Sequence, residues 1–201
     1  SDTPLNALEL ARIVDEVGHT PGVVNIISGP GGVIGEVLTT SPLVDKVAFT
    51  GSTEVGRDIM AKAAATLKKV TLECGGKSAN IVLHDANWAI AIDGSIFASF
   101  YHQGQVCESG TRLLLPKDQH DDFVAEMVRK LESMPMGDPL DPATKVGPVV
   151  SERQMQSVLD YIEIGKQEGA ALACGGERAT EGDLANGCFI KPTVFTGVTN
   201  D

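Results

Sequence analysis

Apolar residues recur at every third or fourth position through several stretches of the chain, which is the spacing of one helix face. Helix start and stop signals flank these stretches. For example, Thr3 and Pro4 precede the first one and Gly18 follows it. The pattern predicts helices over residues 5–17, 33–37, 54–67, 88–102, 118–131 and 151–168.

Short runs rich in β-branched residues lie between the helical stretches and predict strands. They cover residues 23–27, 46–49, 69–72, 79–83, 112–115 and 189–198. Strands that alternate with helices favour an α/β fold with parallel sheets and helical crossovers. The proline-rich stretch 134–148 is expected to be an extended surface segment.

A glycine pair, Gly75-Gly76, separates two expected domains, residues 1–75 and 76–201, and acidic residues predominate more strongly in the second. The chain begins in a predicted helix with no strand before it and stops directly after a predicted strand. We therefore expect it to be part of a longer protein.

Composition and charge exclude several classes of protein. The 201 residues are 42% hydrophobic with a formal net charge of -11, which is typical of a globular protein and not of a disordered tail. The negative charge argues against nucleic acid and anionic membrane surfaces as partners, and no apolar run is long enough to cross a bilayer. The four cysteines show no metal-binding spacing, so we expect no metal site and a reduced, cytoplasmic protein.

The first candidate for chemistry is a glycine-rich turn, residues 29–35 (GPGGVIG), between a predicted strand and a helix. Backbone N–H groups at a helix start bind phosphate, which makes Gly31 and Gly35 candidate cofactor residues. The turn is not a dinucleotide fingerprint, because Ile34 stands where G-x-G-x-x-G requires its last glycine. A turn with a purely structural role is the alternative.

A second turn of this kind covers residues 50–56 (TGSTEVG). Ser52 either caps the following helix or, with Gly51, contacts a pyrophosphate oxygen, since both roles use the positive end of a helix. The spacing alone does not separate the two roles.

A carboxylate, Glu73, ends a predicted strand in residues 72–78 (LECGGKS). The carboxyl end of a strand is where parallel sheets bind ligands, and partial burial there would raise the pKa of Glu73 toward that of a general base. The alternative is a surface glutamate paired with Lys77.

A thiol, Cys107, follows Gly104 and Gln105 after the long apolar stretch 88–102. It is a candidate nucleophile, although many single cysteines are small buried apolar residues. His84 and His102 are conceivable bases for a Cys–His hydrolase, but neither lies in a known signature.

Taken together and in this order, residues 49–56, 72–78 and 104–107 resemble the aldehyde dehydrogenase superfamily. The resemblance extends over essentially the whole chain, through shorter matches at residues 3–5, 21–25, 137–139, 147–148, 168–170 and 192–195. It implies that residues 1–75 are the rear part of a cofactor-binding domain and residues 76–201 the front part of the catalytic domain.

The resemblance implies oxidation of an aldehyde to a carboxylic acid with NAD or NADP, through a thiohemiacetal and a thioester on Cys107. The N–H of Cys107 is implied to supply half of an oxyanion hole. Glu73 matches the general base that activates water for hydrolysis of the thioester. Ser52 matches a hydroxyl that contacts the cofactor phosphate, Gly51 is in the turn beside it, and Gly31 and Gly35 fall near the adenosine half.

Two positions depart from the family pattern. Glu108 stands where the family usually has a small or apolar residue, and a carboxylate there would raise the pKa of the Cys107 thiol if both groups lost water. Ser1 stands where many NAD-preferring relatives have a glutamate that holds the adenosine ribose, so both NAD and NADP stay open.

The resemblance also implies parts that these residues do not include. They are upstream strands with an oxyanion-hole asparagine and a lysine near the adenine ribose, a downstream glutamate on the nicotinamide ribose, and a β-extension for assembly. A homodimer or homotetramer is implied for the intact protein, with the segment alone inactive. The substrate pocket falls only in part on Phe97, Tyr101 and Val106, so the sequence does not name the aldehyde.

Two alternatives to this function remain. One is a non-catalytic binding or structural relative with the same fold, which the retention of Cys107 and Glu73 argues against. The other is a relative that transfers its acyl group to coenzyme A or phosphate. Glu73 favours water as the acceptor, because the resemblance implies that CoA-acylating relatives tend to lack this carboxylate.

Overall fold

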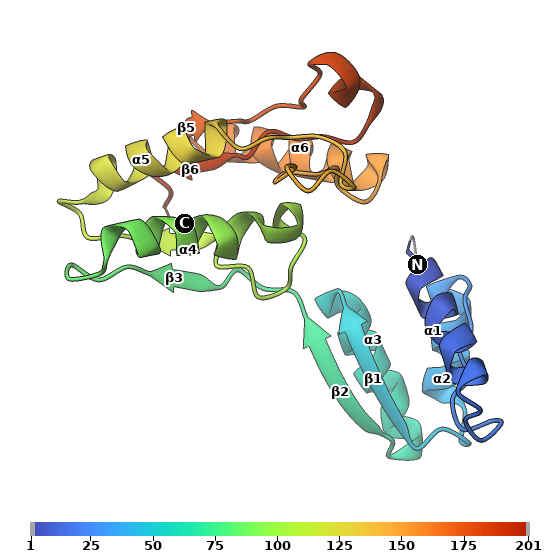
Figure 1. Ribbon diagram of the computed structural model, residues 1–201. Coiled ribbons are helices and arrows are strands. Elements are labelled where there is room, and N and C mark those ends of the chain that lie inside the picture. Colours follow the sequence, from blue (N-terminus) through green and yellow to red (C-terminus); the bar gives the residue numbers. More distant parts are fainter. Residues whose placement is uncertain (1–2, 200–201) are drawn as a thin grey trace. The chain divides into compact units, whose positions relative to one another are not determined.

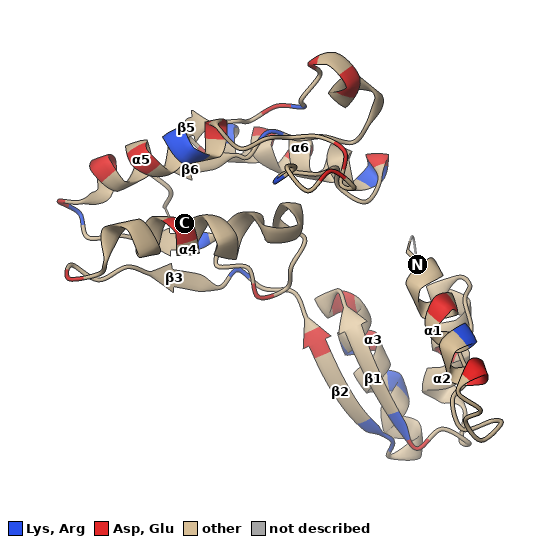
Figure 2. Cartoon of the chain, in the orientation of Figure 1, with Lys and Arg blue, Asp and Glu red and all other residues tan. Residues whose placement is uncertain are grey.

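The computed structural model describes residues 3–199, and the chain forms two compact units that join between Gly75 and Gly76 (Figure 1). None of the helices in this range is both long enough and apolar enough to span a membrane. Wherever a described helix carries lysine or arginine, it carries aspartate or glutamate as well (Figure 2). Among the described helices, none therefore carries basic residues alone.

The first unit is built on two parallel strands, β1 (Lys46–Gly51) and β2 (Lys69–Cys74). They are connected by α3 (Thr53–Ala63) and the short 3-10 helix η1 (Ala64–Thr66), and α3 packs on both strands. Gly56, Ile59 and Ala63 recur at helical spacing on α3 and are its buried residues. Two helices precede the sheet, α1 (Leu5–Glu16) and α2 (Gly31–Thr40), and α2 packs against α3.

The second unit begins with another parallel pair, β3 (Ala79–Ile81) and β4 (Arg112–Leu114). Between them in sequence come α4 (Trp88–Phe100) and the 3-10 turn η2 (Tyr101–Gly104), and α5 (His120–Glu132) packs against α4. Ile92 and Phe123 are fully buried in the core between these helices. The ring of Trp88 meets Phe123 edge-on at a centroid distance of 5.3 Å, a favourable aromatic geometry.

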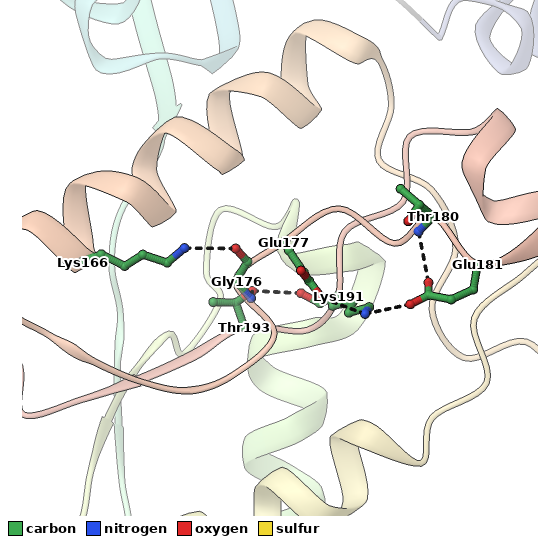
Figure 3. Close-up of polar contacts among 7 residues, drawn as sticks. All are labelled: Lys166, Gly176, Glu177, Thr180, Glu181, Lys191 and Thr193. Atoms are coloured by element: carbon green, nitrogen blue, oxygen red, sulfur yellow. Dashed lines mark hydrogen bonds and ion pairs between the residues drawn. The ribbon is translucent and has the colours of Figure 1, made fainter.

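The last part of the chain contains α6 (Glu152–Gln167), β5 (Ala171–Cys174), η3 (Gly182–Asn186) and β6 (Val194–Thr196). β5 and β6 pair in antiparallel orientation, with a register shift between Leu172 and Cys174. Beside this pair, Lys191 binds Glu177 and Glu181 at 2.8 Å each (Figure 3). The two carboxylates raise the pKa of Lys191 and tie the loop between β5 and η3 to the segment before β6.

The parallel pairs with helical crossovers confirm the α/β expectation, but one predicted strand is absent, one is shorter than predicted and one observed strand was missed. Residues 23–27 form no strand, because the ladders of the described residues give β1 only β2 as a partner. The strand predicted over 189–198 shortens to Val194–Thr196, since Pro192 has no N–H for a ladder. β5 was not predicted, and it makes the third pair antiparallel rather than parallel.

Candidate active site

The carboxyl ends of β1 and β2 bring several candidate residues to one edge of the first unit's sheet. β1 ends at Gly51, and Ser52 follows as the N-cap of α3. Glu73, the one acidic residue of β2 (red in Figure 2), lies in register with Thr50 of β1. Parallel sheets bind their ligands at this edge.

A cavity of about 700 Å³ lies in the first unit, and Gly51 of β1 lines it together with Gly31 and Gly35 of α2. The structure thus brings three of the four expected cofactor residues to one cavity. No atom lies within 4 Å of the position that a Cβ would take at Gly31 or Gly35, so the absence of side chains leaves open space there. The volume falls within the range of small-molecule and cofactor sites, roughly 300–1,000 Å³.

Backbone N–H groups at the start of α2 are suited to donate hydrogen bonds to a phosphate group. Pro30 is the N-cap residue, and its carbonyl accepts from the N–H groups of Val33 and Ile34 at 3.1 Å each. The N–H groups of Gly31 and Gly32 belong to the first helical turn and therefore have no acceptor within the helix. Because the helix dipole makes this end positive, the cavity and its donors fit a dinucleotide cofactor.

Two carboxylates of the cavity wall, Glu36 and Asp58, share one lysine. Lys62 Nζ lies 2.5 Å from Glu36 Oε2 and 2.9 Å from Asp58 Oδ2, and these contacts raise the pKa of Lys62. The ammonium group reduces the repulsion that an anionic ligand would meet. Sequence reasoning missed this cluster, for which the only signal was the i, i+4 spacing of Asp58 and Lys62.

Ser52 acts as a helix cap in the structure. Its Oγ accepts from Val55 N at 3.3 Å. The pKa of Glu54 is lowered first by a hydrogen bond with its own backbone and then by one with the Ser52 side chain. Ser52 is not among the residues that line the cavity. Capping is therefore the role that the structure displays, and contact with a cofactor phosphate stays a prediction.

Glu73 is exposed and makes no hydrogen bond or ion pair with another described residue. The partial burial expected for Glu73 is absent, because β2 places this carboxylate on the exposed face of its strand. Lys77, the alternative partner, donates instead to the carbonyl oxygen of its neighbour Gly76 at 3.2 Å. Its carboxylate oxygens are thus available to accept hydrogen bonds.

Cys107 belongs to the second unit, in the turn between η2 and β4, and it is exposed. Three consecutive residues before this turn have left-handed backbone, with φ of 50° at His102, 57° at Gln103 and 71° at Gly104. Non-glycine residues in this region cost about 1–3 kcal/mol each. The reversal they make ends the helical run and turns the chain into the segment that carries the thiol.

The hydrogen-bond partner of the Cys107 thiol is a carboxylate and not an imidazole. Cys107 Sγ donates to Glu108 Oε2 at 2.8 Å, and the pKa of the thiol is raised, chiefly by this bond. His84 binds Asp118 through Nε2 at 2.9 Å, and the ring of His102 packs on Tyr101. No Cys–His pair of a hydrolase forms among these groups.

The chain matches the model of the aldehyde dehydrogenase family over residues 1–201. It belongs to the aldehyde dehydrogenase family. The structure is similar to that of the NAD+ complex of aldehyde dehydrogenase from Bacillus cereus, with a TM-score of 0.94 and 44% identity over 99% of this chain. It is also similar to a double mutant of betaine aldehyde dehydrogenase from Staphylococcus aureus in complex with NAD+, with a TM-score of 0.96 and 36% identity over 99% of this chain.

A third similar structure is PnpE from Pseudomonas sp. WBC-3, also solved in complex with nicotinamide adenine dinucleotide. In that complex the TM-score is 0.93, with 42% identity over 96% of this chain. The chain spans 40% of the length of each of these three relatives. The position of Ser1, on which the comparison of NAD with NADP depends, lies outside the described residues.

Within this aldehyde dehydrogenase chain, Gln105 is the site residue that sequence reasoning left without a role. Its amide nitrogen donates to the carbonyl of His102 at 3.0 Å, and its amide oxygen accepts from Val150 N at 3.1 Å. One side chain thus holds the left-handed turn and joins it to a loop 45 residues further on. On the other side of Cys107, Gly110 N donates to the carbonyl of Ala98 at 3.0 Å.

Proposed function

We propose that the whole protein oxidises an aldehyde to a carboxylic acid with NAD(P)+, with Cys107 as nucleophile and Glu73 as general base. The observation that carries this proposal is the family match over all 201 residues, in a chain whose exposed cysteine is Cys107. The NAD+ complexes of the similar structures support NAD+ as a cofactor, and the proposal includes NADP+ as the alternative.

The residues that would hold the cofactor line the cavity of the first unit: Gly31, Gly35 and Gly51, with a phosphate at the start of α2. The nicotinamide, when bound, accepts a hydride. Cys107 Sγ attacks the aldehyde carbon and forms a thiohemiacetal, whose oxygen accepts from the N–H of Cys107. Loss of the hydride, with release of the hydroxyl proton to water, leaves a thioester on Cys107.

Glu73 completes the reaction by taking a proton from water as the water oxygen attacks the thioester carbon. The carbon–sulfur bond breaks, the acid leaves, and the thiol is restored. A carboxylate without a protein partner suits this task, because no hydrogen bond has to break before it accepts the proton.

Two aromatic rings on the segment that precedes Cys107 form part of the proposed substrate contact. Phe97 and Tyr101 stack at a centroid distance of 4.9 Å, and they are 64% and 51% exposed. Exposed aromatic rings on the helix that leads to Cys107, together with Val106, would hold an apolar part of the aldehyde.

The test is a pre-steady-state measurement of NADH in the whole protein. Glu73→Gln is expected to give an initial burst of NADH close to one per active site and then to stall, because the thioester forms and is not hydrolysed. Cys107→Ala is expected to give no burst. Full turnover by Cys107→Ala would refute the assignment of the nucleophile.

The remaining alternatives are tested with the parent protein. No reduced nicotinamide with any of a panel of aldehydes would favour a non-catalytic relative. Formation of acyl-coenzyme A in place of acid would exclude water as the acceptor. The proposal includes a homodimer or homotetramer, which sedimentation velocity tests directly.

A further inference from the structure

The thiol of Cys107 and the carboxylate of Glu108 form a hydrogen-bonded pair between adjacent residues. The donor is the sulfur, and the 2.8 Å between Sγ and Oε2 marks a short contact. Both residues are exposed, and Glu108 makes no other hydrogen bond or ion pair with a described side chain. Among the described side chains, the Cys107 thiol is therefore the one hydrogen-bond partner of this carboxylate.

The hydrogen bond and the charge of Glu108 act on the Cys107 thiol in the same direction. An S–H···O bond to an ionised carboxylate stabilises the protonated thiol, and the negative charge of Glu108 disfavours the thiolate. Both effects raise the pKa of Cys107, while the same bond lowers the pKa of Glu108. Since the thiolate is the reactive form of cysteine, the bond opposes the nucleophile that the reaction needs.

Other ionisable groups on the neighbouring segments do not offset this effect. Tyr101 and His102 pack against each other before the turn, and Lys77 donates to the carbonyl of Gly76. Among the described residues, Glu108 is the one charged side chain that acts on the thiol pKa. Within residues 3–199, no lysine or arginine acts on the Cys107 thiol to favour the thiolate.

We propose that Glu108 holds the proton of Cys107 in the resting enzyme and so sets the pH at which the nucleophile becomes available. This inference rests on the proposed role of Cys107 as nucleophile. The step that it controls is ionisation: the S–H bond breaks, the proton passes to water, and the electron pair stays on sulfur for the attack on the aldehyde carbon. At neutral pH the thiol is kept neutral and is protected from oxidation, which also proceeds through the thiolate.

The test is the pH dependence of alkylation of Cys107 by iodoacetamide in the whole protein, without aldehyde or cofactor. Modification is followed by mass spectrometry of the peptide that contains Cys107, so that the other cysteines do not contribute. In Glu108→Gln the profile should move to lower pH, and the rate at pH 7 should rise several-fold, because each unit of pKa changes the thiolate fraction about tenfold below the pKa. The rates should converge at high pH, where the thiol is ionised in both proteins.

Two further variants separate the bond from general charge effects. Glu108→Asp keeps the charge on a shorter side chain, so its profile should lie between those of the parent and Glu108→Gln. Asp121→Asn removes an exposed charge on α5, where Asp121 pairs with His120, and should leave the profile unchanged. A profile of Glu108→Gln that coincides with the parent, or moves to higher pH, would overturn the inference.

The result is independent of turnover. Alkylation needs only the thiol, so a shifted profile in a protein without an NADH burst would support the role of Glu108 and contradict the proposed function. A normal burst with an unshifted alkylation profile would support the proposed function and contradict the role of Glu108.

Discussion

Substitution of Gly51 by alanine tests whether the cavity of the first unit is the cofactor site. A Cβ at this position would lie 3.0 and 3.1 Å from two ring carbons of Phe49 and closer still to Cζ. Carbon atoms pack favourably at about 3.5–4.0 Å, so the ring has to move by roughly 1 Å. Phe49 and Gly51 both line the cavity, and the displaced ring therefore changes its wall.

Crowding of this kind costs about 1–3 kcal/mol, and each 1.4 kcal/mol changes a dissociation constant about tenfold. We expect the Kd for NAD+ of Gly51→Ala, measured by calorimetry on the whole protein, to rise about tenfold, and the Tm to fall. Phe49→Leu in the same protein should recover much of the loss, because the smaller side chain leaves room for the methyl group.

Gly94→Ala is the matched control. It adds the same methyl group inside α4, in the other unit, where nothing lies within 4 Å of the new Cβ. It should leave the Kd unchanged and raise stability slightly, since alanine favours a helix by about 0.5–1 kcal/mol over glycine. If Gly51→Ala kept the parental Kd and Tm, the assignment of Gly51 to the cofactor wall would be wrong.

Three further substitutions have specific expected outcomes. Gly56→Ala places a Cβ 3.0 Å from Cys74 Sγ and should lower the Tm, with recovery in the double variant that adds Cys74→Ala. Lys62→Met leaves two cavity carboxylates unpaired and should weaken NAD+ binding about two- to fivefold at low salt, as for an exposed ion pair, with a smaller effect in 1 M NaCl. Gln105→Leu removes both hydrogen bonds of the Gln105 side-chain amide and should lower kcat far more than it changes KM. Gln105→Glu keeps the acceptor for Val150 N and should retain more activity than Gln105→Leu.

The sequence predicted those elements whose own residues determine them. α6 has its cap in Ser151, whose Oγ accepts from Gln154 N at 3.2 Å, and α5 buries Phe123, Met127 and Leu131 at helical spacing. Both helices were expected within two residues of their observed ends. Helix capping and burial of one helix face depend on residues that are close together in the sequence, so they can be predicted without knowledge of the fold.

Strands depend on partners. The predictions found β1 to β4, but they failed where the partner could not be read from the sequence. Residues 23–27 carry the β-branched side chains of a strand but have no ladder partner among the described residues. β5 (Ala171–Cys174) has little alternation of apolar and polar residues, and it is a strand because β6 pairs with it. Strand propensity describes how a residue fits a pleated surface and does not supply that surface.

The candidate site also has a part that the sequence predicted and a part that only the structure shows. The motifs supplied the candidate residues, and the structure added contacts that no spacing encodes: the ion pair of Lys62 with Glu36, and the hydrogen bond of Gln105 with Val150. These contacts join residues 26 and 45 positions apart. They depend on how helices and loops pack, which one sequence alone does not reveal.

Two carboxylates of this chain have the same chemistry and opposite surroundings, and this difference assigns them separate tasks. Among the described residues, Glu73 has no hydrogen-bond or ion-pair partner, which suits the general base of the proposed function, whereas the carboxylate of Glu108 accepts a hydrogen bond from the Cys107 thiol. Glu73→Gln should therefore stop turnover after the burst, while Glu108→Gln should shift the pH dependence of the burst to lower pH without stopping hydrolysis. If the two groups act on different steps, the double variant should show both effects unchanged, a shifted burst followed by a stall. A double variant whose burst returned to the parental pH dependence would show that Glu73 also influences ionisation of the thiol. The claim that Glu73 and Glu108 act on different steps would then be wrong.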